Sequence, residues 1–163
     1  MVVVSDTSPL SNLAIIGRLA LLPEQFGEVW IPPAVVRELD ALRSPSAQTD
    51  LSEAIQRGWL MQVPLPSSAP FPDELRGLDP GETEALRLAL SAKTNAVLMD
   101  EKEGRQCAAS LGITTIGGLG ILIFARRTGS ISSLRNEIEK LRRDAGFFVD
   151  RDLETRVLAM VAE

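Results

Sequence analysis

Short runs of consecutive apolar residues alternate along the chain with longer segments in which apolar residues recur every three or four positions. The short runs are typical of buried strands, and the longer segments are typical of helices with one apolar face. The predicted strands span residues 2–5, 28–31, 59–63, 96–99 and 113–116. The predicted helices span residues 9–20, 32–42, 46–57, 78–93, 101–111, 119–127, 133–144 and 152–162.

This alternation predicts an α/β fold. Strands separated by helices form βαβ units with right-handed crossovers, and these build a parallel sheet with helices on both faces. If the first strand is central, with the second and third strands on one side and the fourth and fifth on the other, the strand order is 3-2-1-4-5. We therefore expect a three-layer α/β/α fold with a central five-stranded sheet. Its winding direction reverses between the first and fourth strands, and the crevice at such a reversal is where open sheets bind ligands.

The length of 163 residues suits one domain with a substantial core. Residues 64–77 contain four prolines, and they predict a surface loop rather than a linker because the strand and helix pattern resumes beyond them. We expect a single domain over residues 1–163, with a C-terminal helical extension over about 130–163.

Composition narrows the location of the protein. Apolar stretches stay well short of the roughly 20 residues that a membrane-spanning helix needs. The chain begins directly with a predicted strand and shows no signal peptide, so we expect a cytoplasmic protein without a membrane anchor. Cys107 is the only cysteine, which excludes an internal disulfide and predicts a small buried apolar side chain.

Charge and residue usage also restrict the chemistry. The net charge of −5 argues against a protein that holds nucleic acid by bulk electrostatic attraction. Four basic residues are interleaved with acidic ones and therefore favour a solvated helix face, namely Arg135, Lys140, Arg142 and Arg143 with Glu137, Glu139 and Asp144. Histidine is absent, which removes Ser-His-Asp catalysis and histidine-ligated zinc. Any polar catalysis would therefore depend on carboxylates, a lysine or a hard cation.

Two predicted strands end on an aspartate. Asp6 follows the first strand, and Asp100 follows the fourth. Both are expected beside the point where the winding reverses, and a carboxylate there is costly unless water, a hydrogen bond or a cation meets it. The pair is therefore a candidate metal site. The alternative is that each aspartate caps the helix that follows it.

Three further residues are ambiguous on spacing alone. Glu38 falls one to two turns into the helix after the second strand, where it could point over the crevice or stay solvated. Glu82 follows Asp79 at the spacing of a capping box, which is its structural alternative. We expect Glu84, on the same helix, to be solvated. Arg105 could balance the nearby acids or hold a substrate phosphate.

Taken together, these residues resemble the PIN-domain nucleases. The resemblance lies in Asp6 followed by small hydroxyl residues, in Pro-x-x-Val-x-x-Glu ending at Glu38, in an acid opening the helix before the fourth strand, and in Asp100. Three further motifs are similar to a prokaryotic branch related to VapC-like toxins, namely Gly81-Glu82-x-Glu84-Ala85-Leu86, Asp100-Glu101-x-x-Gly104-Arg105 and Gly117-x-x-Gly120-Ile121-Leu122. Leu98 departs from the toxins, many of which carry a threonine there.

The resemblance covers nearly the whole chain and implies both a fold and a site. It implies the 3-2-1-4-5 sheet and the convergence of Asp6, Glu38, Glu82 and Asp100 on one acidic pocket as the catalytic and metal-binding residues. Clustered carboxylates need a counter-charge, and oxygen ligands without histidine favour Mg²⁺ or Mn²⁺. We therefore expect a metal-dependent ribonuclease, and the resemblance implies products with a 5′-phosphate and a 3′-hydroxyl.

The expected partners follow from the same hypothesis. RNA is the expected substrate, with Ser8 and Arg105 as candidate substrate-binding residues. The apolar helix around 119–124 and the last helix predict a homodimer and, in a toxin, a groove for a small antitoxin protein. Burial of the apolar helix inside one protomer is the alternative. The competing function is a catalytically silent PIN fold that acts as a binding or interaction module.

Overall fold

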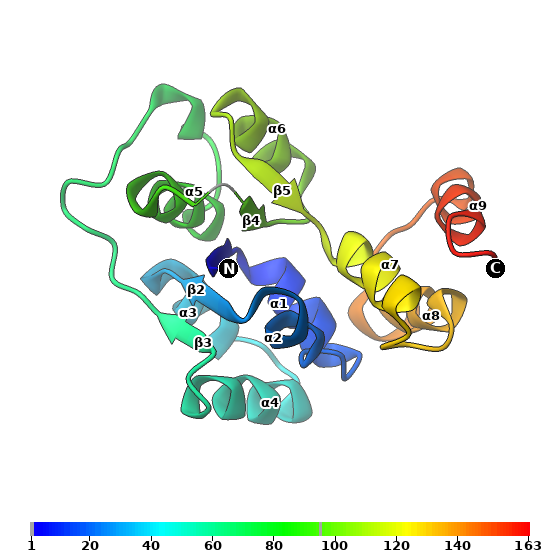
Figure 1. Ribbon diagram of the computed structural model, residues 1–163. Coiled ribbons are helices and arrows are strands. Elements are labelled where there is room, and N and C mark those ends of the chain that lie inside the picture. Colours follow the sequence, from blue (N-terminus) through cyan, green and yellow to red (C-terminus); the bar gives the residue numbers. More distant parts are fainter. Residues whose placement is uncertain (1, 95) are drawn as a thin grey trace.

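A parallel five-stranded sheet forms the centre of the computed structural model, which describes residues 2–94 and 96–163 (Figure 1). Its strands are β1 (Val2–Ser5), β2 (Glu28–Ile31), β3 (Leu60–Gln62), β4 (Ala96–Leu98) and β5 (Thr114–Ile116). Their order is β3-β2-β1-β4-β5, which confirms the predicted topology. Every neighbouring pair is parallel, so the carboxyl ends of all five strands lie at one edge of the sheet.

Helices cover both faces of the sheet. The helices are α1 (Thr7–Ile15), α2 (Leu21–Phe26), α3 (Pro33–Asp40), α4 (Pro45–Gln56), α5 (Pro80–Ala92), α6 (Lys102–Ser110), α7 (Gly118–Thr128), α8 (Leu134–Ala145) and α9 (Arg151–Ala159). Figure 1 shows α5 and α6 on one side of the strands, and α1, α2, α4 and α7 on the other. This arrangement is the predicted three-layer α/β/α fold.

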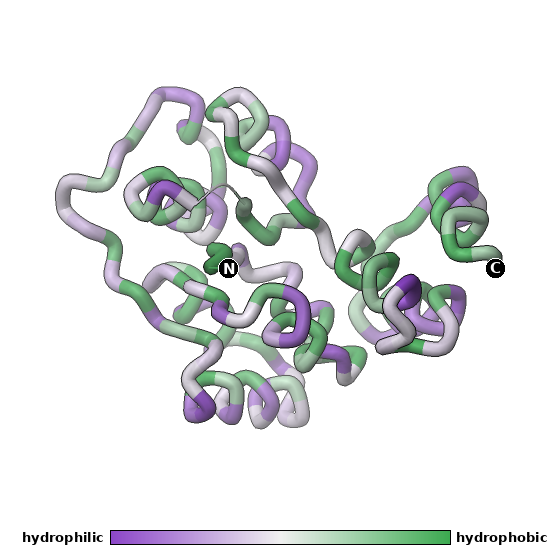
Figure 2. The backbone as a smooth tube through the Cα atoms, in the orientation of Figure 1, coloured by the Kyte–Doolittle hydropathy of each residue, from purple (hydrophilic) through white to green (hydrophobic). Residues whose placement is uncertain are grey.

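Consecutive apolar residues in the central strands face opposite layers. Val3 packs in the core beneath α1, α4 and α7, whereas Val4 packs in the core beneath α5 and α6. Leu98 and Val97 divide between the two cores in the same way. A strand buried on both faces has to be apolar throughout, and Figure 2 shows these strands as hydrophobic segments.

One predicted helix is wrong. The helix expected over residues 9–20 is two helices, because α1 ends at Ile15 and α2 begins at Leu21. Gly17 lies between them with φ of +70°, a backbone conformation that residues other than glycine rarely adopt. The apolar spacing continues through Leu19 into α2, so the periodicity concealed the break.

The proline-rich segment 64–77 is irregular apart from a short 3₁₀ turn, η1 (Asp73–Leu75). Arg87 of α5 fixes this loop, since its guanidinium donates hydrogen bonds to the carbonyl oxygens of Ala69 and Pro70 and lies 5.0 Å from the centre of the Phe71 ring. Leu75 is fully buried. The segment is therefore a surface loop anchored to the domain, as predicted.

The C-terminal helices pack onto the main core. Ile121 and Leu122 of α7 are fully buried, and α7 lies against α1, α2 and α8. Most of the apolar surface of α7 is thus covered within the chain, while Phe124, Phe148 and Met160 are at least half exposed. Throughout the described ranges, the helices are too short or too polar to cross a membrane.

Candidate metal centre

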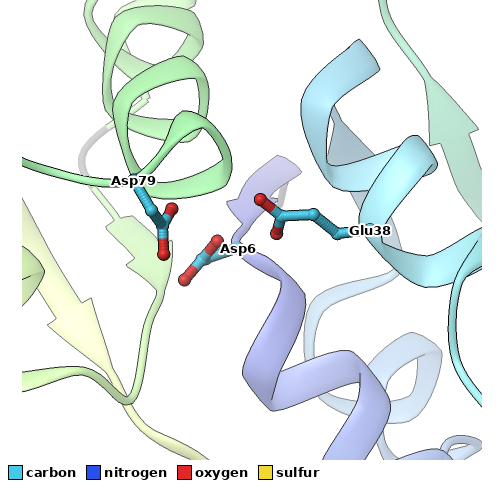
Figure 3. Close-up of side chains that lie close together, drawn as sticks. All are labelled: Asp6, Glu38 and Asp79. Carbon is cyan, nitrogen blue, oxygen red and sulfur yellow. The ribbon is translucent and has the colours of Figure 1, made fainter.

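Three carboxylates from separate elements point toward one another at the carboxyl edge of the sheet (Figure 3). Asp6 follows β1, Glu38 lies on α3, and Asp79 directly precedes α5. One oxygen of each lies within 4.8 Å of the others. Within the described part of the chain, none of the three forms an ion pair with a lysine or arginine. The cluster therefore lacks a protein counter-charge, and its oxygens suit a hard divalent cation.

Asp6 is held at the tip of β1 in a buried position. Its backbone N–H donates to the carbonyl oxygen of Leu98 at 2.9 Å, and only 2% of the residue is exposed. Although Asp6 occupies the position before α1, its side chain makes no capping hydrogen bond. Its Oδ1 atom is buried and has no hydrogen-bond partner among the described residues. An orphaned carboxylate oxygen is costly, and a bound cation would satisfy it.

Electrostatics agree with this geometry. Burial raises the pKa of the Asp6 carboxyl to about 7, only partly offset by the backbone amide of Thr7. The neighbouring carboxylates of Asp79, Glu82 and Glu38 raise this pKa further. Without a metal, Asp6 therefore keeps its proton to a higher pH than a solvated aspartate does, and a bound cation would favour the ionised form.

Glu38 points over the crevice rather than into solvent. Its Oε2 accepts a hydrogen bond from the Thr7 hydroxyl, and its Oε1 accepts one from the backbone N–H of Gly81 at 3.1 Å. A Cβ atom at Gly81 would lie 2.5 Å from Glu38 Oε2, so any larger residue would displace the carboxylate. Thr7 and Gly81 thus each hold one oxygen of the Glu38 carboxylate.

Asp79 and Glu82 form the predicted capping box. Asp79 Oδ1 accepts from the N–H of Glu82 at 2.8 Å, and Glu82 Oε2 accepts from the N–H of Asp79 at 3.2 Å. Asp79 also belongs to the three-carboxylate cluster, a role that its capping position concealed in the sequence. Glu82 is buried beside that cluster but outside it, and burial, followed by the charge of Asp79, raises the pKa of its carboxyl.

Asp100 also lies outside the three-carboxylate cluster. It does not cap α6, the helix that follows it, but accepts a hydrogen bond at Oδ1 from the N–H of Gly118 in α7 at 2.7 Å. Asn12, which the sequence did not single out, donates to Oδ2 at 3.3 Å. A Cβ atom at Gly117 would lie 3.0 Å from Oδ1. Burial is the main cause of a raised Asp100 pKa.

A family model described as a PIN domain matches residues 2–163. The chain belongs to the PIN-domain family. PIN domains are generally metal-dependent nucleases, and the cluster of Asp6, Glu38 and Asp79 is consistent with this chemistry. Comparisons with curated proteins and with solved structures gave no significant match. The family, the strand order and the orphaned Asp6 oxygen therefore agree on a divalent-metal centre.

Two helices of this PIN domain cap each other. Glu84 of α5 accepts the N–H of Ala34 at 2.7 Å in the first turn of α3, where Pro32 at the cap position has no side-chain acceptor. Glu38 of α3 in turn accepts the N–H of Gly81 in the first turn of α5. The expectation that Glu84 is solvated is therefore wrong. The reciprocal caps fix α3 against α5 and hold Glu38 in the centre.

The two candidate substrate-binding residues lie close to these elements. Ser8 is half-buried in the first turn of α1. Arg105 is half-buried on α6, and its Nη1 donates to the carbonyl oxygen of Met99 at 2.9 Å. Both lie near the carboxyl edge of the PIN sheet, and their contact with substrate stays a prediction.

Proposed function

We propose that this PIN domain is a ribonuclease that hydrolyses RNA phosphodiester bonds with Mg²⁺ or Mn²⁺. The proposal depends on one observation above all: the carboxylate of Asp6, which lies beside those of Glu38 and Asp79, has a buried oxygen with no partner among the described residues. The choice of RNA as substrate is supported by the sequence resemblance to VapC-like toxins.

Asp6, Glu38 and Asp79 would hold the cation, because their oxygens converge and Thr7 and Gly81 keep Glu38 in place. When bound, a divalent cation activates water and neutralises the charge that develops on the scissile phosphodiester. The protein supplies the fixed geometry. Binding costs little rearrangement because the carboxylates already face one another.

Asp100 is suited to accept a proton from the attacking water. Gly118 and Asn12 fix its orientation, and Oδ2 carries only the longer, 3.3 Å hydrogen bond from Asn12. Its raised pKa makes the carboxylate a stronger base than a solvated aspartate. We therefore propose Oδ2 of Asp100 as the proton acceptor, with Glu82 supporting the centre through the capping box.

A cleavage assay on a mixed RNA pool tests the proposed function. The purified protein should cut RNA with Mg²⁺ or Mn²⁺, leave 5′-phosphate ends and stop in EDTA. Asp6→Asn should abolish cleavage, whereas Asp152→Asn, the same change at an exposed aspartate of α9, should leave it unchanged. Cleavage that persists undiminished in EDTA would contradict the metal-dependent mechanism.

The competing hypothesis is a PIN fold that binds partners without turnover. Both hypotheses predict an intact carboxylate cluster, so metal binding alone does not separate them. A protein that binds Mn²⁺ but releases no product from any RNA in the pool would replace the nuclease proposal with the interaction-module proposal.

A toxin role and a homodimer belong to the same proposal. They are supported by the resemblance to VapC-like toxins and by the exposed side chains of Phe124, Phe148 and Met160 on the C-terminal helices and their connection. Sedimentation at tens of micromolar tests the dimer, and a clean monomer would reject it. A small protein encoded next to this chain that co-purifies with it and inhibits cleavage would support an antitoxin.

A further inference from the structure

An open hollow lies beside Asp100, on the β4–β5 side of the carboxyl edge. It has a volume of about 500 Å³ and is lined by Asp100, Lys102, Arg105, Gln106, Ala109 and Thr115. It thus runs from the end of β4 along α6 to the edge strand β5. This volume falls within the range of small-ligand sites, and the hollow adjoins the place where the proposed reaction would occur.

Arg105 presents a fixed guanidinium to this hollow. One of its five N–H donors is used by the carbonyl oxygen of Met99. Arg105 forms no ion pair with any carboxylate in the described ranges, although Asp100 lies nearby. Its other donors are therefore available to a ligand, and the bond to Met99 reduces the entropy that binding would cost.

A second cation stands on the same helix face. Lys102 is exposed at the start of α6, three residues before Arg105, and residues at this spacing are neighbours on a helix. Lys102 likewise forms no ion pair with a described residue. Gln106 and Thr115 add neutral hydrogen-bonding groups to the same hollow. Two cations with spare donors favour an anionic, oxygen-rich ligand, and arginine matches the geometry of a phosphate.

We propose that this hollow binds the phosphate next to the scissile one in the RNA strand, with Arg105 as the principal contact and Lys102 as the second. The inference rests on the proposed nuclease function and adds the path of the substrate. The strand leaves the metal centre over α6 and the β5 edge.

Kinetics of charge-removing variants test the subsite from the side of the protein. Arg105→Ala should lower kcat/KM for RNA on the order of tenfold, mainly through KM, and Lys102→Ala should do so to a smaller extent. Arg105→Lys should recover part of the loss, because it restores the charge without the planar fork. Arg151→Ala, which removes an exposed arginine of α9, is the matched control and should have no effect. Affinity for Mn²⁺ should remain unchanged in all four variants.

Neutral linkages test it from the side of the substrate. Methylphosphonates are placed one at a time along an RNA whose cleavage position has been mapped. One neutral linkage next to the cut should slow cleavage by the wild type about tenfold. It should not slow Arg105→Ala further, because that variant has already lost the contact. In Arg105→Lys it should remove only the part of the activity that the lysine restores.

The outcomes separate the subsite from the nuclease function. If the wild type cleaves RNA but Arg105→Ala and Arg105→Lys keep the wild-type KM, the subsite is overturned and the nuclease function stands. The same conclusion follows if each neutral linkage slows both variants as much as it slows the wild type. An equal rise in KM in Arg151→Ala also overturns the subsite, because the effect is then one of net charge. A wild type that cleaves no RNA with any divalent metal overturns the proposed function and the subsite with it.

Discussion

Buried carboxylates occur in two regions of this PIN domain, and the regions differ in whether protein groups meet them. At the carboxyl edge, Asp6 has a buried oxygen without a partner in the described structure. On the C-terminal helix α8, Glu137 is 3% exposed but accepts hydrogen bonds from Arg18 at 2.7 and 3.1 Å and from Lys140 at 3.1 Å.

Glu163 is similarly well satisfied. It accepts backbone N–H groups of Leu134 and Arg135 in the first turn of α8 and pairs with Arg126 at 2.7 Å. Burial raises the pKa of Glu163, but these bonds outweigh it, so that its pKa lies well below the usual range. The same balance lowers the pKa of Glu137. These carboxylates tie the C-terminal helices together and to the main core.

The difference indicates which acids are structural. When protein groups already donate hydrogen bonds to both oxygens of a buried carboxylate and a cation compensates its charge, the carboxylate has little left to offer a ligand. A buried carboxylate without them, such as Asp6 with a pKa raised to about 7, retains capacity for a ligand. The contrast therefore assigns metal binding to the carboxyl edge and stability to the C-terminal pairs.

Substitutions at the two kinds of carboxylate should affect different properties. The largest expected effect is on the cleavage rate. Asp6→Asn should lower the cleavage rate at least on the order of a hundredfold, while the metal-free melting temperature stays equal or rises, because one of several repelling carboxylates is removed. Glu137→Gln should leave the rate near that of the wild type. A lower metal-free melting temperature in Asp6→Asn would instead favour a structural role for Asp6.

The next effect concerns stability. Glu137→Ala should lower the free energy of unfolding by about 2 kcal/mol, because it leaves Arg18 and Lys140 without their partner. The value is below that of a fully buried pair, since about a third of each cationic side chain is exposed. Urea unfolding measures it, with the exposed Glu139→Ala as control. Equal values for both variants would remove the contrast between the regions.

The pH dependence of stability should have opposite signs in the two regions. Asp6 has a higher pKa folded than unfolded, so the folded protein binds more protons between about pH 4 and about pH 7, and stability falls as the pH rises through that window. Glu137 and Glu163 have lowered pKa values, so their contribution is lost as the pH falls below the ordinary glutamate range. Urea unfolding in EDTA should show the first slope in the wild type and a smaller one in Asp6→Asn. Identical slopes would contradict the Asp6 assignment.

The smallest effect tests the reciprocal caps. Glu84→Ala should cost about 1 kcal/mol of stability, as expected for the loss of a helix cap, and should weaken Mn²⁺ binding several-fold by releasing α3 and Glu38. Glu84→Gln keeps an acceptor oxygen for Ala34 and should recover both properties. A loss of stability in Glu84→Ala with unchanged Mn²⁺ affinity would limit Glu84 to a purely structural role.

The positions of the central strands were predictable because they depend on a local property, whereas their order was implied by the resemblance to PIN-domain nucleases. Each central strand is buried on both faces, so Val3 with Val4, and Val97 with Leu98, appear in the sequence as uninterrupted apolar pairs. The break at Gly17 was not predictable from periodicity, since the apolar spacing runs through it.

The details of the site depend on contacts between distant residues. Glu38 meets Gly81 across 43 positions, and Glu84 meets Ala34 across 50. Neither contact follows from local patterns, because each requires α3 and α5 to pack together. For the same reason the charge pattern of residues 133–144 gave no sign that Glu137 is buried. Its main partner, Arg18, lies 119 residues away in the sequence.

Direct binding of Mn²⁺ to the metal-free protein near neutral pH tests the central claim, and it can be followed by calorimetry or by electron paramagnetic resonance. The wild type and Glu137→Gln should bind Mn²⁺ with similar affinity, and Asp6→Asn should lose at least about tenfold in affinity. Binding to Asp6→Asn as tight as that to the wild type, or no binding to the wild type at all, would contradict the assignment of a metal centre to Asp6, Glu38 and Asp79.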